Sequence, residues 1–482
     1  MTARDAARPP HWNAILLAVF VAAVVVRAGW LIRQAWQTGD LSPLTFDDER
    51  WYWRMAESLH RGDGLVGEFG HRAARMPLYP AALSLVAGSA HGIAWVKIGQ
   101  VFVGALTAVF AAVLARDVAH STIARDHAID ADTPARATSA TLVAGLAAGV
   151  VVAFDPLLVG VTSLLLTETL FIAELSAIWY VGWQITGFGK QPARAAHQVQ
   201  PAATAGRQSS NLCWLLIAAL TVATVYTRPS SLAPLVGFFV FLLIHRRFEL
   251  SAAARTLGVL IVLILSLTPW AWRNQRLTGD RCWLTHRAGI SLYDGVGPRA
   301  TGASDLADLK NAPAVRGLGE AEWNAYFRDQ AYRSIREDPA RIIGLAWVKM
   351  QRMWSPFLHA DEYQASVGRI VVAGWTLLLY AFALLGAWAM RHRWSAAAYL
   401  LMPAICLSAL HSVFVGSVRY RLGALPMLAV LAAIGLATLW QRPGALRFRT
   451  TNLDNPNPGI NARPESGAGW QRSNEQSGSH ST

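Results

Sequence analysis

Three carboxylates stand side by side at the start of the segment "FDDERWYWRMAESLHRGDGL", residues 46–65. Asp47, Asp48 and Glu49 precede aromatic and apolar residues at helical spacing, which indicates a helix lying on a membrane surface. A carboxylate at a helix start commonly caps the helix, but capping needs only one of the three. A carboxylate beside a substrate hydroxyl can instead act as a general base. Asp47 and Asp48 are therefore candidates for chemistry as well as for capping.

An arginine followed by prolines comes next, in "HRAARMPLYP", residues 71–80. A guanidinium group can hold a phosphate through two parallel hydrogen bonds. An arginine at a membrane interface also commonly extends its charge toward the lipid head groups. Both interpretations stay open for Arg75 at this level.

A lone acidic residue, Glu168, occupies the apolar stretch "LLLTETLF". A carboxylate is costly to bury in hydrocarbon, so such a residue is a candidate for function, the alternative being a protonated Glu168 that bonds two helices together. If this membrane-spanning helix begins near Val161 on the outer side, Glu168 lies beneath the same surface as Asp48.

The elements that must position these residues are membrane-spanning helices. The chain has 482 residues, 53% of them hydrophobic and 15% charged, and apolar runs of about 15 to 25 residues recur along it. We expect an all-α integral membrane protein, a bundle of about 10–12 transmembrane helices with short surface helices in the outer loops. Leu78–Ala90 is either re-entrant or a further span. The other expected spans are Trp12–Ile32, Ile93–Ala115, Ala140–Phe154, Val161–Trp183, Leu212–Tyr226, Leu232–Ile244, Leu257–Trp272, Ile370–Met390, Ser395–Val415 and Leu422–Trp440.

The orientation follows from the lysines and arginines at the helix ends. With ten spans the basic clusters fall on one side, which the positive-inside bias assigns to the cytoplasm. Outer loops at about 34–77 and 273–342 and the turn at 416–421 then face outward, and the segment "EAEWNAYFRDQAYRSIRED" in the second loop predicts a surface helix ending near Pro339. Residues 1–446 form the transmembrane domain, and the polar residues 447–482 are expected to be a disordered cytoplasmic tail.

Composition also excludes some classes of function. The net charge of +13 fits contact with anionic lipids, and no phosphate-binding loop or dinucleotide fingerprint is present, so nucleic acid is not an expected partner. Cys213, Cys282 and Cys406 are isolated in the sequence and indicate neither a disulfide nor a zinc site.

Several motifs appear in an order typical of one superfamily. They are "DDERWYWRMAESLHRGDGL", "RMPLYP", "TETLF", "YTRPSSLAP", "TPWAWRNQRLTG", "GISLYDGVGP" and "SVRYRLGALPMLAVLAAIGL". The chain resembles the bacterial polytopic glycosyltransferases of the GT-C fold that use polyprenyl-phosphate sugars, and is similar to protein O-mannosyltransferases and lipid A aminoarabinose transferases. The resemblance covers about Trp12 to Trp440. It implies an inner-membrane enzyme that moves a sugar from a polyprenyl-phosphate donor to an envelope lipid, glycan or protein at the periplasmic, outer face.

The same resemblance implies roles for single residues. Asp48 matches the catalytic aspartate of the first loop, and Glu168 the acidic position of the second. The aminoarabinose branch has a lysine and two prolines where this chain has "RMP" from Arg75, so that substrate is not indicated. The residues expected to contact substrate are Asp47, Tyr52, Arg75, Tyr293, Arg419 and Arg421, with Arg75, Arg419 and Arg421 neutralising the phosphate as its charge develops. Tyr293 would stack on the sugar, unless "LYDGVGP" is only a turn.

Some alternatives remain open from the sequence. Asp48 and Glu168 could together bind Mg²⁺ or Mn²⁺, since oxygen ligands suit both ions. A ligase or polymerase of O-antigen type would use diphosphate-linked donors instead. A transporter or flippase of lipid-linked sugars usually has repeated halves, which are not evident here. The sequence leaves undecided the sugar, the acceptor, inversion or retention at the sugar carbon, and the oligomeric state.

Overall fold

The protein is described by a computed structural model that covers residues 11–126, 134–188, 203–306, 313–359 and 367–440. Within these ranges it is all-helical and contains no strand. The predicted tail at 447–482 lies outside the described residues. The long helices are α1 (Trp12–Thr38), α4 (Gly92–Asp126), α5 (Pro134–Phe154), α7 (Glu168–Thr186), α8 (Ala203–Thr227), α9 (Leu232–His245), α10 (Leu250–Thr278), α15 (Val367–Ala389), α16 (Trp394–Val413) and α17 (Leu425–Trp440). The shorter helices are α2 (Asp47–His60), α3 (Leu78–Ser84), α6 (Pro156–Val161), α11 (Ala288–Val296), α13 (Glu320–Glu337) and α14 (Pro339–Trp354).

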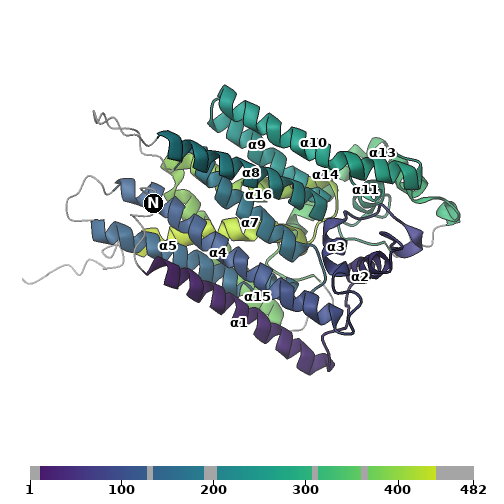
Figure 1. Cartoon of the computed structure of the whole chain (residues 1–482), viewed down its shortest axis with the longest axis horizontal. Coiled ribbons are helices and arrows are strands. Elements are labelled where there is room, and N and C mark those ends of the chain that lie inside the picture. The colour runs from purple at the N-terminus through teal and green to yellow at the C-terminus, as the bar shows by residue number, and fades with distance from the viewer. Residues whose placement is uncertain (1–10, 127–133, 189–202, 307–312, 360–366, 441–482) are drawn as a thin grey trace, which may run out of the picture. The chain divides into compact units, whose positions relative to one another are not determined.

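The expected fold class is confirmed. In the described part of the chain, seven helices are long and apolar enough to cross a membrane, and residues 138–154 and 229–245 form shorter apolar helices. The long helices run side by side, and α2, α3, α11 and α13 gather at one end of them (Figure 1). The predicted surface helix before Pro339 is present as α13. The amphipathic helix α14, which follows it directly, was not predicted.

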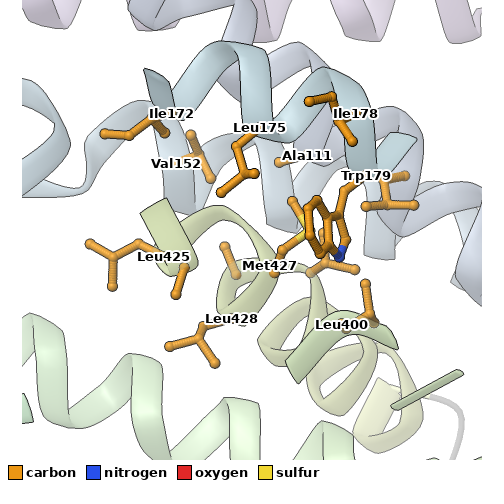
Figure 2. Close-up of a cluster of buried hydrophobic side chains, with 14 of the residues drawn as sticks. Ala111, Val152, Ile172, Leu175, Ile178, Trp179, Leu400, Leu425, Met427 and Leu428 are labelled. Atoms are coloured by element: carbon orange, nitrogen blue, oxygen red, sulfur yellow. The ribbon is translucent and has the colours of Figure 1, made fainter. Parts of the chain in front are cut away.

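Helix α17 lies at the centre of the bundle. It is apolar on all sides, as expected for a helix with no solvent-facing stripe, and it packs against α4, α5 and α15. Figure 2 shows part of the buried apolar core between this helix and α7. The residues labelled there are Ala111, Val152, Ile172, Leu175, Ile178, Trp179, Leu400, Leu425, Met427 and Leu428.

Two expected elements differ from the structure. In the segment Leu78–Ala90 only Leu78–Ser84 is helical, and seven residues span about 10 Å, too short to cross a bilayer of about 30 Å. The expected continuous helix Val161–Trp183 is wrong, because α6 ends at Val161 and α7 begins at Glu168. Glu168 is therefore the first residue of a helix, although it is only 1% exposed.

The break between α5 and α6 is stabilised by one buried ion on each side. Arg27 of α1 donates from Nη1 to the carbonyl of Ala153 at 3.1 Å and from Nη2 to that of Val152 at 3.2 Å, at the end of α5 where carbonyls lack helical partners. Asp155 accepts the amide hydrogens of the first turn of α6. Gly104 leaves room, since a Cβ there would lie 2.8 Å from Nε of Arg27. Backbone groups freed by the break are thus satisfied inside the protein.

We expect Arg27→Met to lower the Tm of the purified protein by several degrees. The change leaves the carbonyls of Val152 and Ala153 unpaired in the interior, at a cost of roughly 1–3 kcal/mol for each buried group. Thermal unfolding in detergent measures the effect. Arg33→Met is the matched control, because Arg33 is exposed on the same helix. Equal Tm values for the two variants would show that the break needs no buried cation.

Candidate active site

Glu49, and neither of the two aspartates before it, holds the start of α2. Its Oε2 accepts the amide hydrogens of Thr45 at 2.8 Å and Phe46 at 2.9 Å. Its Oε1 accepts that of Leu165 at 2.8 Å, in the turn that leads into α7. Glu49 therefore fixes the surface helix to the start of α7, and the capping role expected of the acidic cluster falls to this residue.

The two aspartates have different surroundings. Asp47 is exposed and accepts a hydrogen bond from Arg50 at 2.9 Å on the outside of α2. Asp48 points inward, where its Oδ1 accepts a hydrogen bond from Nη2 of Arg75 and its Oδ2 accepts one from Nη1 of Arg419 at 3.0 Å. The structure thus brings Asp48, Arg75 and Arg419 together, as the sequence predicts, and leaves Asp47 apart from them.

The neighbouring arginines control the ionisation of Asp48. Burial on its own would raise the pKa of Asp48, but Arg75, Arg419 and Arg287 outweigh burial and hold that pKa well below its usual range. Burial likewise acts to lower the pKa of Arg75, and the carboxylate of Asp48 outweighs it and raises that pKa. Asp48 is therefore a firmly ionised carboxylate at neutral pH.

Arg419 also links Asp48 to Glu168. It lies in the 3-10 helix η7 (Val418–Ala424), and its Nε donates to Oε1 of Glu168. The same oxygen accepts a hydrogen bond from Nη1 of Arg228 at 2.6 Å. Oε2 of Glu168 is buried and has no hydrogen-bond partner among the described residues. We call Asp48, Glu168, Arg75, Arg228 and Arg419 the charge cluster.

The charge cluster carries more positive than negative charge. Two carboxylates contact three guanidinium groups, so one positive charge is left over before any ligand binds. A small pocket borders the cluster and is lined by Glu168, Arg228 and Arg419 together with Ser230 and His411. An anion such as a phosphate is the ligand that such a surplus of guanidinium groups favours.

Aromatic rings hold the arginines in place. The guanidinium group of Arg75 lies 5.3 Å from the ring centre of Tyr52 and 5.5 Å from that of Trp51. Arg228 lies 5.6 Å from the ring of Tyr420 in the same way. Tyr52, expected to contact substrate, therefore supports Arg75 in this structure, and its ring packs edge-on against Tyr79.

Two of the expected substrate contacts lie away from the charge cluster. Arg421 is fully buried, and its Nη1 donates to the carbonyls of Met353, at 3.1 Å, and Ser355. Tyr293 packs on Phe327 with ring centres 5.2 Å apart. Both residues have structural partners where the sequence suggested ligand contacts.

Two arginines of the site were not among the expected site residues. Arg228, in "YTRPSS", stands at a helix end, where an arginine that reaches the membrane interface gives the same pattern. Arg287 precedes α11 and lies close enough to Asp48 and Arg75 to affect their pKa values. Its signal in the sequence is weak, because "THRAGI" resembles an ordinary loop.

The donor set does not fit the divalent ion that the sequence left open. Among the described residues no three His, Cys, Asp or Glu side chains gather closely enough to hold a metal. Both oxygens of Asp48 already accept bonds from arginine, and Oε1 of Glu168 accepts two. A dication placed between these carboxylates would also be repelled by three guanidinium groups.

Comparison with known proteins gives few matches. No protein-family model and no curated protein matches this chain. The crystal structure of ArnT from Cupriavidus metallidurans in the apo state is similar over 89% of this chain and 77% of that chain, with 16% identity and a TM-score of 0.34. The structure of ArnT from the same organism bound to undecaprenyl phosphate is similar over 90% of this chain and 78% of that chain, with 14% identity and a TM-score of 0.33. At this identity the roles of individual residues do not transfer from one chain to the other.

The ionised state of Asp48 predicts how stability depends on pH. Because its folded pKa is depressed, its ion pairs stabilise the protein fully above the unfolded value of about 3.9, and this contribution is lost as the pH falls below that value. We expect the Tm of Asp48→Asn to lie below that of wild type by a constant amount from about pH 8 to pH 5, and by less at about pH 3. Thermal unfolding across this range is the measurement. Asp47→Asn, with its exposed side chain, should differ little from wild type throughout, and a gap for Asp48→Asn that is unchanged at pH 3 would contradict the assignment.

Proposed function

We propose that this protein is a glycosyltransferase that moves a sugar from a polyprenyl-phosphate carrier to an acceptor hydroxyl in the cell envelope. The observation that carries the proposal is the charge cluster, in which three arginines surround two carboxylates at one end of the membrane-spanning helices. A lipid-phosphate donor needs a phosphate site at the membrane surface and a base next to it. The sequence motifs that resemble polyprenyl-phosphate-dependent enzymes support the same assignment.

The arginines suit a phosphate leaving group. As the bond from the sugar carbon to the phosphate oxygen breaks, negative charge builds up on the phosphate, and guanidinium groups already in place stabilise it. Arg75, Arg228 and Arg419 come from three separate parts of the chain and meet in the charge cluster, where Arg419 links the other two through Asp48 and Glu168. We propose that they bind the donor phosphate and supply the positive charge that a divalent ion would otherwise bring.

Donor binding would also prepare the base. In the unliganded protein two arginines hold Asp48, which makes its carboxylate a weak proton acceptor. A phosphate competes for the same guanidinium groups, and as it takes up their hydrogen bonds, the oxygens of Asp48 become free and more basic. Asp48 is 30% exposed, which leaves it accessible to an acceptor hydroxyl.

The chemical step then follows without a metal. Asp48 takes the proton of the acceptor hydroxyl as its oxygen forms a bond to the sugar carbon, and the bond to the phosphate oxygen breaks. The polyprenyl monophosphate leaves as an anion held by the arginines. Glu168 orients Arg228 and Arg419, and its Oε2, which has no partner among the described residues, is available to a hydroxyl or water in the pocket.

The outer face is the proposed side for this site. Helices α7, α9 and α17 begin at the end of the bundle that carries the charge cluster, and α9 ends at the basic sequence His245-Arg246-Arg247. Basic residues also stand between α15 and α16, at Arg391 and Arg393. The positive-inside bias assigns those ends to the cytoplasm, which supports an outer position for the cluster in a bacterial inner membrane.

A matched pair of variants tests the proposed function. Membranes containing wild type and a radiolabelled polyprenyl-phosphate sugar should transfer the label and release polyprenyl monophosphate. We expect Asp48→Asn to lower the rate about a hundredfold or more, as is typical when a general base is removed. Asp47→Asn should retain nearly full activity, because Asp47 is exposed and pairs with Arg50 on the same helix.

Other results of this assay would overturn the proposal. Activity of Asp48→Asn close to that of wild type would leave Asp48 only a structural role. Release of a diphosphate from a diphosphate-linked donor would instead assign the chain to the ligases. Movement of intact donor across the membrane without cleavage would favour a flippase.

A further inference from the structure

A second pocket adjoins the charge cluster. It is formed by α2, residues 67–71, α11 and α13, and is lined by Trp51, Phe69, His71, Trp323, Phe327 and Arg287. Aromatic rings dominate its surface, and one cation lies among them. The pocket is narrow, and its lining, apolar with a few placed polar groups, is of the kind found in small-molecule sites. We call it the aromatic pocket.

One wall of the aromatic pocket is held in a costly backbone conformation. Phe69 has a φ of 58° and is followed by Gly70 at 74°, and a left-handed residue with a bulky side chain is uncommon. This conformation places the Phe69 ring 5.6 Å from the ring of Trp323. The carboxylate of Glu320 on α13 secures the segment by accepting the amide hydrogens of Arg72 and Ala73. The rings are therefore fixed in place before a ligand binds.

Arg287 has no ion pair or hydrogen bond from its guanidinium group in the part of the chain that the structure describes. It stacks 5.3 Å from the ring of Trp51, and Asp294, the nearby acid on α11, is already bonded to Ser304 and to the amide of Asp305. Burial, followed by the repulsion of Arg75, lowers the pKa of Arg287 to about 10. An arginine that is partly buried and has no ion pair lacks the anion that would offset its desolvation.

We propose that the aromatic pocket binds a sugar ring of the acceptor that carries a carboxylate, a hexuronic acid, with Arg287 bonding the carboxylate. Aromatic rings pack on the apolar face of a pyranose, and a single guanidinium group matches a planar carboxylate through two parallel bonds. The phosphate site of this protein differs in having three arginines. The assignment to the acceptor, as opposed to the donor, rests on the proposed function.

The position of the pocket supports the acceptor. Trp51 lies between the two sites, with Arg75 of the charge cluster over its ring at 5.5 Å and Arg287 of the aromatic pocket over it at 5.3 Å. Oδ2 of Asp48 accepts a hydrogen bond from Arg419, and its Oδ1 accepts one from Arg75, the arginine that lies over this tryptophan. A sugar in the aromatic pocket would approach Asp48 from the surface helices, and the lipid phosphate from the ends of the membrane-spanning helices.

Ligand-observed NMR tests the proposal on the full chain, purified in a detergent without a sugar head group. Sodium glucuronate and glucose are titrated separately, with no donor present, so that the result does not depend on transfer. We expect glucuronate to bind wild type at least about tenfold more tightly than glucose, as a charge-assisted pair provides. Arg287→Gln should reduce glucuronate binding to the level of glucose. Arg333→Gln, an exposed arginine on α13, is the matched control and should bind like wild type.

Two more variants separate the possible sites. Phe69→Ala should weaken both sugars, and because its ring is 57% exposed, the change should leave the Tm nearly unaltered. Arg419→Gln should leave glucuronate binding intact. Loss of binding in Arg419→Gln would place the carboxylate in the charge cluster and overturn the proposal. Equal binding of glucose and glucuronate by wild type, or full binding of glucuronate by Arg287→Gln, would also overturn it.

Discussion

The bond network of Arg419 is the interaction on which the site depends. One guanidinium group contacts Asp48 of the first loop and Glu168 of the second, two residues that lie 120 positions apart in the chain. Without a cation between them, two carboxylates this close would repel each other, and one of them would take up a proton. Arg75 and Arg228 make the net charge of the cluster positive. The same network that keeps the carboxylates ionised can therefore bind an anion. Stability and ligand preference therefore come from one arrangement of charge.

The helix break before α7 makes that arrangement possible. A helix continuing through residues 161–168 would bury Glu168 among the apolar membrane-spanning helices. The break instead places Glu168 at the start of α7, where it contacts Arg419 of η7. The chain has a second break just before this one, between α5 and α6, where helix ends satisfy two buried charges, Arg27 at the end of α5 and Asp155 at the start of α6. Breaks of this kind are tolerated in membrane proteins only where the protein itself pairs the freed backbone groups. Polar contacts inside the bundle thus offset the free-energy cost of burying the backbone groups and charges at these breaks.

The sequence predicted the parts of this structure that depend on local pattern. Apolar runs predicted the long helices, and the resemblance of several short motifs to one superfamily grouped Asp48, Glu168, Arg75 and Arg419 as expected site residues. It could not predict which carboxylate caps α2, because Asp47, Asp48 and Glu49 have equal capping chemistry and only the turn at Leu165 selects Glu49. Arg421 illustrates the same limit, since it is two residues from Arg419 but turns into the core to bond Met353. The aromatic pocket is formed by segments more than two hundred residues apart in the chain, and no local sequence pattern predicts that such segments lie together.

The central claim, that the charge cluster binds the phosphate of a polyprenyl lipid, can be tested directly by native mass spectrometry of the purified protein. Undecaprenyl phosphate and undecaprenol, which share one tail, compete at equal concentration for wild type and for Arg228→Gln. We predict that wild type prefers the phosphate by at least about tenfold, as charge-assisted bonds to guanidinium provide, and that Arg228→Gln loses most of this preference. Equal binding of the phosphate and the alcohol by wild type would contradict the account, because the arginines would then serve only to pair the carboxylates.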